Sequence, residues 1–325
     1  MKGALRIETF LWCLIMPAVL FYSPNDSPTE WERRLRDFIP NLDMRVWPDI
    51  GDPNDIEFAL VWKLPPGNYE KLQNLRCICS LGQGVDHIFT EAKLPPQVQI
   101  MRLVDPWMAQ AMSEWMLLQV LRFHRQVPEY EDLERQFKWK VLPPPETSEC
   151  AVGMLGLGEL GRDAARKISA LGFKVAGWSR TEKEVEGVEC FYGEKQLEAF
   201  LNRTKILCCL LPLTPKTTGI INSKTISQLP RGSYIVNAGR GQHVVDTCLL
   251  RALDTGHLAG AALDVFNEEP LPSQHAYWAH PKVSVWPHVS AQSNADSAAE
   301  QVADAIGKVF SGRVPNNLVS REQQY

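Results

Sequence analysis

A glycine-rich turn constrains the fold of this chain more than any other feature of its sequence. The apolar run 151–155 leads directly into Gly156-Leu157-Gly158-Glu159-Leu160-Gly161, and an amphipathic helical pattern follows over 162–171. In this context the first glycine permits a tight turn, the second lets a pyrophosphate approach the backbone, and the third allows close helix–strand packing. We therefore predict a dinucleotide site at these six residues, with the phosphates at the helix N-terminus. The competing explanation is that the glycines serve packing alone.

The end of the next strand distinguishes two forms of such a cofactor. The strand predicted at 174–178 is followed by Ser179, Arg180 and Thr181, and then by Lys183. A unit that binds NAD places Asp or Glu near this point to accept hydrogen bonds from the ribose hydroxyls. Here that acid is missing, and an arginine with two hydroxyls suits a 2′-phosphate. We predict that NADP(H) is preferred over NAD(H); a solvated polar loop is the alternative.

Short apolar runs alternate with helical patterns in two regions, which is typical of α/β proteins with parallel sheets. The runs of the first region lie at 18–22, 44–47, 57–62, 76–81 and 98–103. A long helix rich in Met and Trp begins at about Pro106, and the second region runs from 151 to a last helix over about 295–310. The length of 325 residues fits about two domains.

Composition argues against several classes of partner. The chain is 45% hydrophobic and 22% charged, which is typical of a globular protein and not of a disordered one. Its net charge of −4 and the lack of a basic run give no support for a nucleic-acid or membrane partner. The eight cysteines form no C-x-x-C pair and no zinc spacing, and several lie in apolar runs. We interpret them as reduced thiols of a cytoplasmic protein and predict no metal site.

The N-terminal 22 residues superficially resemble a signal peptide, because Lys2 and Arg6 precede an apolar stretch. That stretch is short for a membrane span, and Pro17 interrupts it. We predict instead that 18–22 is the first buried strand. Residues 1–15 would then be an extension of unknown role before a start at Met16; a targeting role is the alternative.

Three short motifs lie at predicted carboxyl ends of strands, where open α/β sheets bind ligands. They place Arg240 in Asn237–Gly241, Glu269 shortly after Leu263–Phe266, and His288 in Trp286–Ser290. An arginine pairs bidentately with a carboxylate and polarises the neighbouring keto oxygen. A histidine delivers a proton to that oxygen as a nicotinamide supplies hydride, and a nearby glutamate favours the imidazolium. The three residues together suit the reduction of a 2-oxo acid.

At these motifs the chain resembles the D-isomer-specific 2-hydroxyacid dehydrogenase family, over roughly residues 17–315. The segments that carry the resemblance follow the family's order: 81–86, 156–161, 211–217, 237–241, 263–272 and 287–290. The resemblance implies that Arg240 binds and orients the substrate, that His288 is the acid/base, and that Glu269 is its partner.

The resemblance also implies residues that hold the ligands. Asp264 would contact the nicotinamide side of the cofactor, which would further be lined by Leu211, Pro212, Ala238 and Gly239. The main-chain amides of Gln83, Gly84 and Val85 would cradle the substrate carboxylate. Trp47 is a candidate wall of the substrate pocket, although packing in the core is the more common role for such a residue.

The fold implied by the resemblance has two domains. A flavodoxin-like substrate domain, 16–107 plus 289–325, would receive a Rossmann NAD(P)-binding domain, 108–288, as an insertion. Within the family the chain is most similar to the glyoxylate/hydroxypyruvate reductase A branch. This implies NADPH-dependent reduction of glyoxylate to glycolate and of hydroxypyruvate to D-glycerate.

Two other functions stay open at this point. One is a dehydrogenase for another D-2-hydroxy acid, of the D-lactate or D-glycerate type. The other is a dinucleotide-sensing binding protein on the same fold, although sensing needs no acid/base pair. The Met- and Trp-rich helix favours a homodimer.

Overall fold

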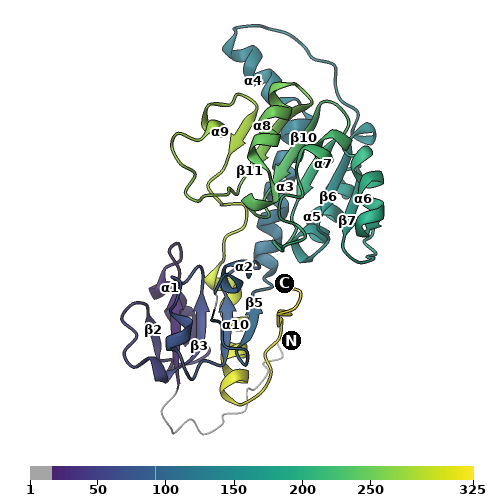
Figure 1. The fold of residues 1–325 in the computed structure, drawn as a ribbon. Coiled ribbons are helices and arrows are strands. Elements are labelled where there is room, and N and C mark those ends of the chain that lie inside the picture. The colour runs from purple at the N-terminus through teal and green to yellow at the C-terminus, as the bar shows by residue number, and fades with distance from the viewer. Residues whose placement is uncertain (1–16, 92) are drawn as a thin grey trace, which may run out of the picture. The chain divides into compact units, whose positions relative to one another are not determined.

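The strand runs are separated by segments long enough for crossover connections, so each region forms a sheet of parallel strands. The computed structural model describes residues 17–91 and 93–325 and divides into two units (Figure 1). The smaller unit holds the described residues up to Leu103 together with Ala295–Gln324; the larger unit holds Val104–Asn294 and Tyr325. The predicted extension, 1–15, lies outside the described residues. The sequence prediction places the domain boundaries at 107/108 and 288/289, whereas the two units of the structure divide at 103/104 and 294/295.

The smaller unit contains a five-stranded sheet in the order β2-β1-β3-β4-β5. This is the doubly wound 2-1-3-4-5 order of flavodoxin-like folds, as the sequence predicts. Its strands are β1 (Ala18–Tyr22), β2 (Met44–Val46), β3 (Ile56–Val61), β4 (Cys77–Ser80) and β5 (Gln99–Arg102). Its helices are α1 (Pro28–Arg36), α2 (Asp86–Phe89) and α10 (Ala295–Phe310), with short 3₁₀ turns at Pro53–Asp55 and Tyr69–Lys71.

Both faces of this sheet are covered, because apolar residues occupy alternate positions on both sides of its strands. Val19 and Phe21 of β1 pack in one cluster with α1 and α10. Ala18 and Leu20 of the same strand pack in a second cluster on the other face. Helix α10 therefore completes a core to which strand β1 contributes.

The larger unit contains a seven-stranded sheet in the order β12-β11-β10-β9-β6-β7-β8. Read from β8, the first six strands have the 3-2-1-4-5-6 order of the Rossmann fold, and β12 adds to the β11 edge. The strands are β6 (Ala151–Leu155), β7 (Lys174–Ser179), β8 (Val188–Tyr192), β9 (Ile206–Cys209), β10 (Ser233–Asn237), β11 (Leu258–Leu263) and β12 (Val283–Val285). The helices are α3 (Pro106–His124), α4 (Val127–Arg135), α5 (Glu159–Ala170), α6 (Gly193–Asn202), α7 (Ser223–Gln228), α8 (Asp246–Asp254) and α9 (Ala276–Ala279), and 3₁₀ turns lie at Thr147–Glu149 and Gly241–His243.

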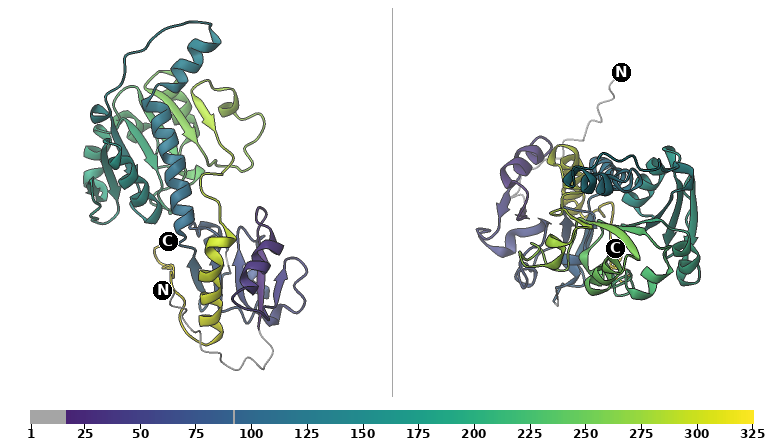
Figure 2. Two further views of the ribbon diagram at one scale, coloured as in Figure 1. Left: turned by 180° about the vertical axis from the view of Figure 1, so that it is seen from behind. Right: turned by 90° about the horizontal axis from the view of Figure 1, so that it is seen from above.

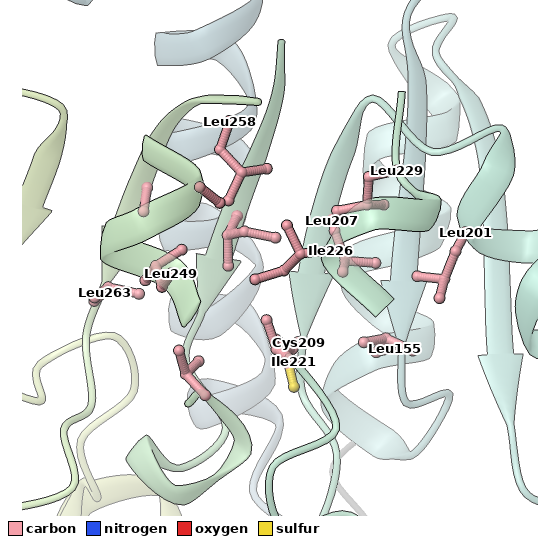
Figure 3. Close-up of a cluster of buried hydrophobic side chains, with 14 of the residues drawn as sticks. Leu155, Leu201, Leu207, Cys209, Ile221, Ile226, Leu229, Leu249, Leu258 and Leu263 are labelled. Atoms are coloured by element: carbon pink, nitrogen blue, oxygen red, sulfur yellow. The ribbon is translucent and has the colours of Figure 1, made fainter. Parts of the chain in front are cut away.

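Helices cover both faces of this sheet as well. Ile206 and Cys208 of β9 pack toward α3 and α5, and Figure 2 shows α3 running along the sheet. Leu207 and Cys209 pack into the cluster formed with α6, α7 and α8. Figure 3 shows Leu207 close to Ile226 of α7 within that cluster. The two doubly covered parallel sheets confirm the predicted fold class, an α/β protein with a Rossmann unit inserted in a flavodoxin-like one.

Parallel strands bring all their carboxyl ends to one edge of the sheet, and the predicted site residues of the larger unit lie at or just beyond that edge. Among residues 17–91 and 93–325, no helix is long and apolar enough to cross a membrane.

Candidate active site

The glycine turn has the geometry that a bound pyrophosphate requires. Gly156 has φ +102°, and a Cβ there would lie 2.7 Å from the Leu210 carbonyl oxygen. At Gly161 a Cβ would lie 1.9 Å from the Gly156 carbonyl oxygen, so the helix approaches the strand too closely for any side chain. At Gly158, the N-cap of α5, a Cβ would meet nothing within 4 Å. The turn therefore fits a phosphate group beside the α5 amides. The Leu157 side chain lies in the core over Gly177.

Ser179 is the last residue of β7, and the polar residues that are predicted to favour NADP over NAD begin with it. Its hydroxyl is largely buried and donates a hydrogen bond to the Thr181 carbonyl oxygen at 2.6 Å. Arg180 is exposed, and its Nε donates to the hydroxyl of Tyr325 at 2.6 Å. No carboxylate occupies 179–181, which keeps this strand end compatible with a phosphate.

Arg240 lies in the turn after β10, where its main chain is held on several sides. Asn237 donates from Nδ2 to the Arg240 carbonyl oxygen at 2.9 Å and accepts the Gly239 N–H at 3.1 Å. The Arg240 N–H donates to Nδ1 of His243 at 3.0 Å. The guanidinium donates from Nη1 to the Gly239 carbonyl oxygen at 2.7 Å. This arginine therefore projects from a turn with little conformational freedom.

His288 and Glu269 form a pair in the larger unit, as the motifs predict. Nδ1 of His288 lies 2.9 Å from Oε2 of Glu269, and Oε1 of the same carboxylate accepts the Phe266 N–H at 3.1 Å. The side chains are 31% and 20% exposed, so solvent screens the pair only in part. The carboxylate fixes Nδ1 as the protonated nitrogen of a neutral ring, and Nε2 is then the nitrogen that can exchange a proton with a substrate.

The main chain of His288 is in the left-handed region, with φ +55°, which is uncommon for a residue other than glycine. Its N–H donates to the Asp264 carbonyl oxygen at 2.9 Å. The Asp264 carboxylate, fully buried, accepts the N–H groups of Val289 and Ser290 at 2.9 and 3.0 Å. Asp264 thus fixes the main chain of residues 288–290, which includes His288. Its predicted contact with the nicotinamide stays a prediction.

The lining predicted for the cofactor lies in the same part of the unit. Leu211 and Pro212 follow β9, and Ala238 and Gly239 follow β10; Leu211 and Ala238 are buried. The two loops touch at Gly239, where a Cβ would lie 3.2 Å from the Leu211 carbonyl oxygen.

The predicted substrate residues Gln83, Gly84, Val85 and Trp47 belong to the smaller unit. The first three follow β4, and their loop is held by Ser80, whose hydroxyl donates to the Gly84 carbonyl oxygen at 2.7 Å and accepts the Gly82 N–H at 3.3 Å. Nε2 of Gln83 is buried and has no hydrogen-bond partner among the described residues. Trp47 packs edge-on against Tyr22, with ring centroids 5.3 Å apart. Their roles toward a substrate stay predictions.

His243, to which the sequence analysis gives no role, lies between the loops that follow β9 and β10. Its imidazole is fully buried and contacts both the Arg240 N–H and the Pro212 carbonyl oxygen. The only signal in the sequence was its position two residues after Asn237–Gly241.

Comparison with known proteins agrees with this geometry. Residues 117–290 match the profile of the NAD-binding domain of D-isomer specific 2-hydroxyacid dehydrogenases. A glyoxylate/hydroxypyruvate reductase A of Serratia proteamaculans is 39% identical over 306 residues, 93% of this chain and 97% of the relative.

Two solved structures are similar over nearly the whole chain. A D-isomer specific 2-hydroxyacid dehydrogenase from Xanthobacter autotrophicus, in complex with NADPH and MES, has a TM-score of 0.91 at 39% identity and covers 96% of this chain and 100% of its own. An NADPH-dependent glyoxylate/hydroxypyruvate reductase from Sinorhizobium meliloti, in complex with NADP and sulfate, has a TM-score of 0.88 at 38% identity and covers 95% and 100%. This chain therefore belongs to the D-isomer specific 2-hydroxyacid dehydrogenase family.

Proposed function

We propose that this protein is an NADPH-dependent reductase that converts glyoxylate to glycolate and hydroxypyruvate to D-glycerate. The observation that carries the proposal is the contact of 2.9 Å between His288 Nδ1 and Glu269 Oε2, in the same unit as Arg240 and the glycine turn. Relatives and solved structures that bear the reductase name support the choice of substrates and cofactor.

The residues that would hold the cofactor come from five strand ends, those of β6, β7, β9, β10 and β11. The turn 156–161 would bind the pyrophosphate, and Ser179, Arg180 and Thr181 would bind the 2′-phosphate. Leu211, Pro212, Ala238, Gly239 and Asp264 would line the rest. When bound, the reduced nicotinamide supplies a hydride to the carbonyl carbon of the 2-oxo acid.

Arg240 and His288 divide the remaining chemistry. The guanidinium pairs with the substrate carboxylate and polarises the keto oxygen, so negative charge that develops there is stabilised. The protonated imidazole gives its Nε2 proton to that oxygen, which completes the alcohol. The Glu269 carboxylate stabilises the imidazolium before the transfer and holds the ring in place. In the opposite direction the same histidine acts as the base toward a D-2-hydroxy acid.

The proposal is tested by mixing the purified protein with NADPH or NADH and glyoxylate, hydroxypyruvate, pyruvate or no acceptor. We expect NADPH to be oxidised faster with glyoxylate or hydroxypyruvate than with pyruvate. With each of these two acceptors, NADPH should also be oxidised faster than NADH. Preference for pyruvate would favour a dehydrogenase of the D-lactate type. Cofactor binding without any turnover would favour a dinucleotide sensor.

The His288→Ala variant separates chemistry from binding. Loss of the proton donor is expected to lower turnover at least about a hundredfold while NADPH binding persists. His257→Ala is the matched control, because His257 precedes β11 at the opposite edge of the sheet and contacts the Ile226 carbonyl oxygen. Turnover of His288→Ala within a few-fold of wild type would show that another group is the acid.

We further propose a homodimer in the cytoplasm. After α4 the chain runs through 136–146, where Phe137, Trp139 and Val141 are 97%, 100% and 80% exposed. Exposed apolar side chains of this size mark protein contacts. Leu118 and Leu121 of α3, the Met- and Trp-rich helix, are also exposed. We therefore propose that a second copy of this chain covers these apolar side chains. The seven described cysteines are free thiols, which supports a reducing compartment.

Light scattering coupled to size-exclusion chromatography tests the dimer. We expect a mass of about twice 36.7 kDa for the wild type and a shift toward 36.7 kDa for a Phe137→Ser, Trp139→Ser double variant. Lys140→Ser, in the same segment, is the control. A wild-type mass of 36.7 kDa at all concentrations would rule the dimer out.

A further inference from the structure

We infer that His243 is a positioning residue that sets the substrate-binding turn and a cofactor loop together. The inference rests on the proposed function, because it assigns His243 a task toward Arg240 and Pro212. The side chain is wholly buried at the end of the 3₁₀ turn Gly241–His243. It therefore acts on a ligand only through the residues that it contacts.

The hydrogen bonds of the ring determine its tautomer. A backbone N–H can only donate, so Nδ1, which lies 3.0 Å from the Arg240 nitrogen, must be the acceptor. The proton of the neutral ring is then on Nε2, which lies 3.3 Å from the Pro212 carbonyl oxygen and donates to it. One imidazole therefore joins two loops that follow adjacent strands, β9 and β10.

Both ends of this connection lie beside other fixed groups. The Pro212 carbonyl oxygen also accepts the hydroxyl of Thr217 at 2.7 Å, so the position of this carbonyl is defined by two donors. At the other end, the Arg240 carbonyl oxygen accepts the His243 N–H at 3.2 Å in addition to the Asn237 amide. The main chain of Arg240 is therefore held at both its N–H and its carbonyl group.

The glycine before Arg240 gives independent support. A Cβ at Gly239 would lie 2.9 Å from Nδ1 of His243 and 3.0 Å from its Cε1. Any side chain there would push the ring out of the position from which it reaches Arg240. Gly239 and His243 thus pack against each other, and the absence of a side chain at 239 leaves room for the imidazole. This reason for a glycine differs from the one at the turn 156–161, where the glycines are expected to receive a pyrophosphate.

The two nitrogens can be tested separately with amide side chains. Asn places a polar atom near the site of Nδ1, and Gln places one near the site of Nε2. His243→Asn keeps an acceptor for the Arg240 N–H and loses the contact with Pro212. His243→Gln keeps a donor to Pro212 and leaves the Arg240 N–H without its acceptor. A merely structural histidine would make both variants fail alike.

The experiment measures the Kd of NADPH by its fluorescence, the Kd of oxamate (an unreactive analogue of a 2-oxo acid) in the presence of NADP⁺, and the KM for glyoxylate. For His243→Asn we expect NADPH to bind about threefold to tenfold more weakly, with the Kd of oxamate within about twofold of wild type. For His243→Gln we expect the reverse pattern, with the change in kcat/KM appearing in KM. Gly239→Ala should weaken both ligands.

His257→Gln, at the far edge of the sheet, is the control for general destabilisation. The inference is wrong if both His243 variants bind both ligands like the wild type, or if they lower only the melting temperature, as a structural role predicts. The binding measurements need no turnover. A wild type that binds NADPH and oxamate but reduces no 2-oxo acid would therefore refute the proposed function and leave the role of His243 to be decided by the two variants.

Discussion

Glu269 holds His288 through one carboxylate oxygen and its own loop through the other. Oε2 contacts Nδ1 of the imidazole at 2.9 Å, and Oε1 accepts the Phe266 N–H at 3.1 Å. Because Phe266 lies three residues after the end of β11, the carboxylate ties the ring to the loop that leaves this strand. The pair is thus both an electrostatic arrangement and a means of orienting the imidazole.

Glu269→Gln should separate these two effects. The amide oxygen still accepts a hydrogen bond from Nδ1, but the charge that stabilises the imidazolium is gone. A charge-assisted bond contributes about 1.5–3 kcal/mol, so kcat/KM for glyoxylate is expected to fall roughly tenfold to a hundredfold. Glu268→Gln, at the exposed neighbouring carboxylate, is the control and should change little. Equal effects of the two substitutions would contradict a specific role for Glu269.

The left-handed backbone of His288 predicts an unusual order of stabilities. An alanine at φ +55° keeps the strain of a Cβ, whereas a glycine adopts this conformation without cost. His288→Gly is therefore expected to be about 1 kcal/mol more stable than His288→Ala by denaturant unfolding. At His257, which has no positive φ, the order should reverse. An alanine variant more stable than the glycine variant at 288 would show that this backbone is not strained.

Asp264→Asn should destabilise the protein, although residue size hardly changes. The carboxylate accepts two backbone N–H groups while fully buried, and an amide offers one oxygen and a second group that donates. One N–H then loses its acceptor, at a cost of about 1–3 kcal/mol, which lowers the melting temperature by several degrees. Asp254→Asn, where the side chain is 71% exposed, is the control. Unchanged melting of Asp264→Asn would mean that the segment after His288 is held by other contacts.

Local patterns explain why much of this fold was predictable. The motif at 156–161 indicates a strand, a turn and a helix within a few residues. The apolar runs indicate buried strands, because a strand in a sheet that is covered on both faces has apolar side chains on both sides. The short strand β8, Val188–Tyr192, was missed. It is an edge strand of its sheet and all five of its residues are partly or largely exposed, so the apolar signal is weak.

The contact between Glu269 and His288 was predictable because a motif surrounds each residue. Arg240, Glu269 and His288 each lie in one, and the structure places Glu269 and His288 in contact. The part played by His243 depends on a contact with Pro212, 31 residues earlier, and the hold of Asp264 on Val289 spans 25 residues. Such contacts form only when neighbouring strands bring their carboxyl ends together. A local sequence pattern therefore does not predict them.

The buried cysteines predict both low thiol reactivity and an alkaline limit to stability. Burial raises the pKa of Cys77 and of Cys209 from 9.0 to about 12, because an apolar interior disfavours the thiolate. In the unfolded chain these thiols ionise near pH 9, while in the folded protein they stay neutral. The free energy of unfolding is therefore unaffected by them below pH 9 and falls as the pH rises from 9 toward 12.

Alkylation followed by peptide mapping tests this at a pH between 8 and 9. We expect Cys77, Cys79, Cys208 and Cys209 to be unmodified in the folded protein and modified fully in denaturant. Cys248, which is partly exposed on α8, serves as the internal comparison and should react before these four thiols. Labelling of Cys209 at the rate of Cys248 would show that β9 opens on the time scale of the reaction.

One charge at the end of β7 tests the proposed preference for NADPH. The Ser179 side chain is 8% exposed and bonds to the Thr181 carbonyl oxygen, so position 179 lies against the loop that would receive the 2′-phosphate. Ser179→Asp puts a carboxylate there, which repels a phosphate and accepts hydrogen bonds from a ribose hydroxyl. We expect the ratio of kcat/KM for NADPH to that for NADH to fall at least tenfold, as removal of about 1.4 kcal/mol of discrimination requires. Ser179→Asn, with the same shape and no charge, should leave the ratio within a few-fold. Binding of 2′,5′-ADP, measured calorimetrically, should weaken in the aspartate variant only. If the ratio of kcat/KM for NADPH to that for NADH is unchanged in this variant, position 179 does not determine cofactor choice.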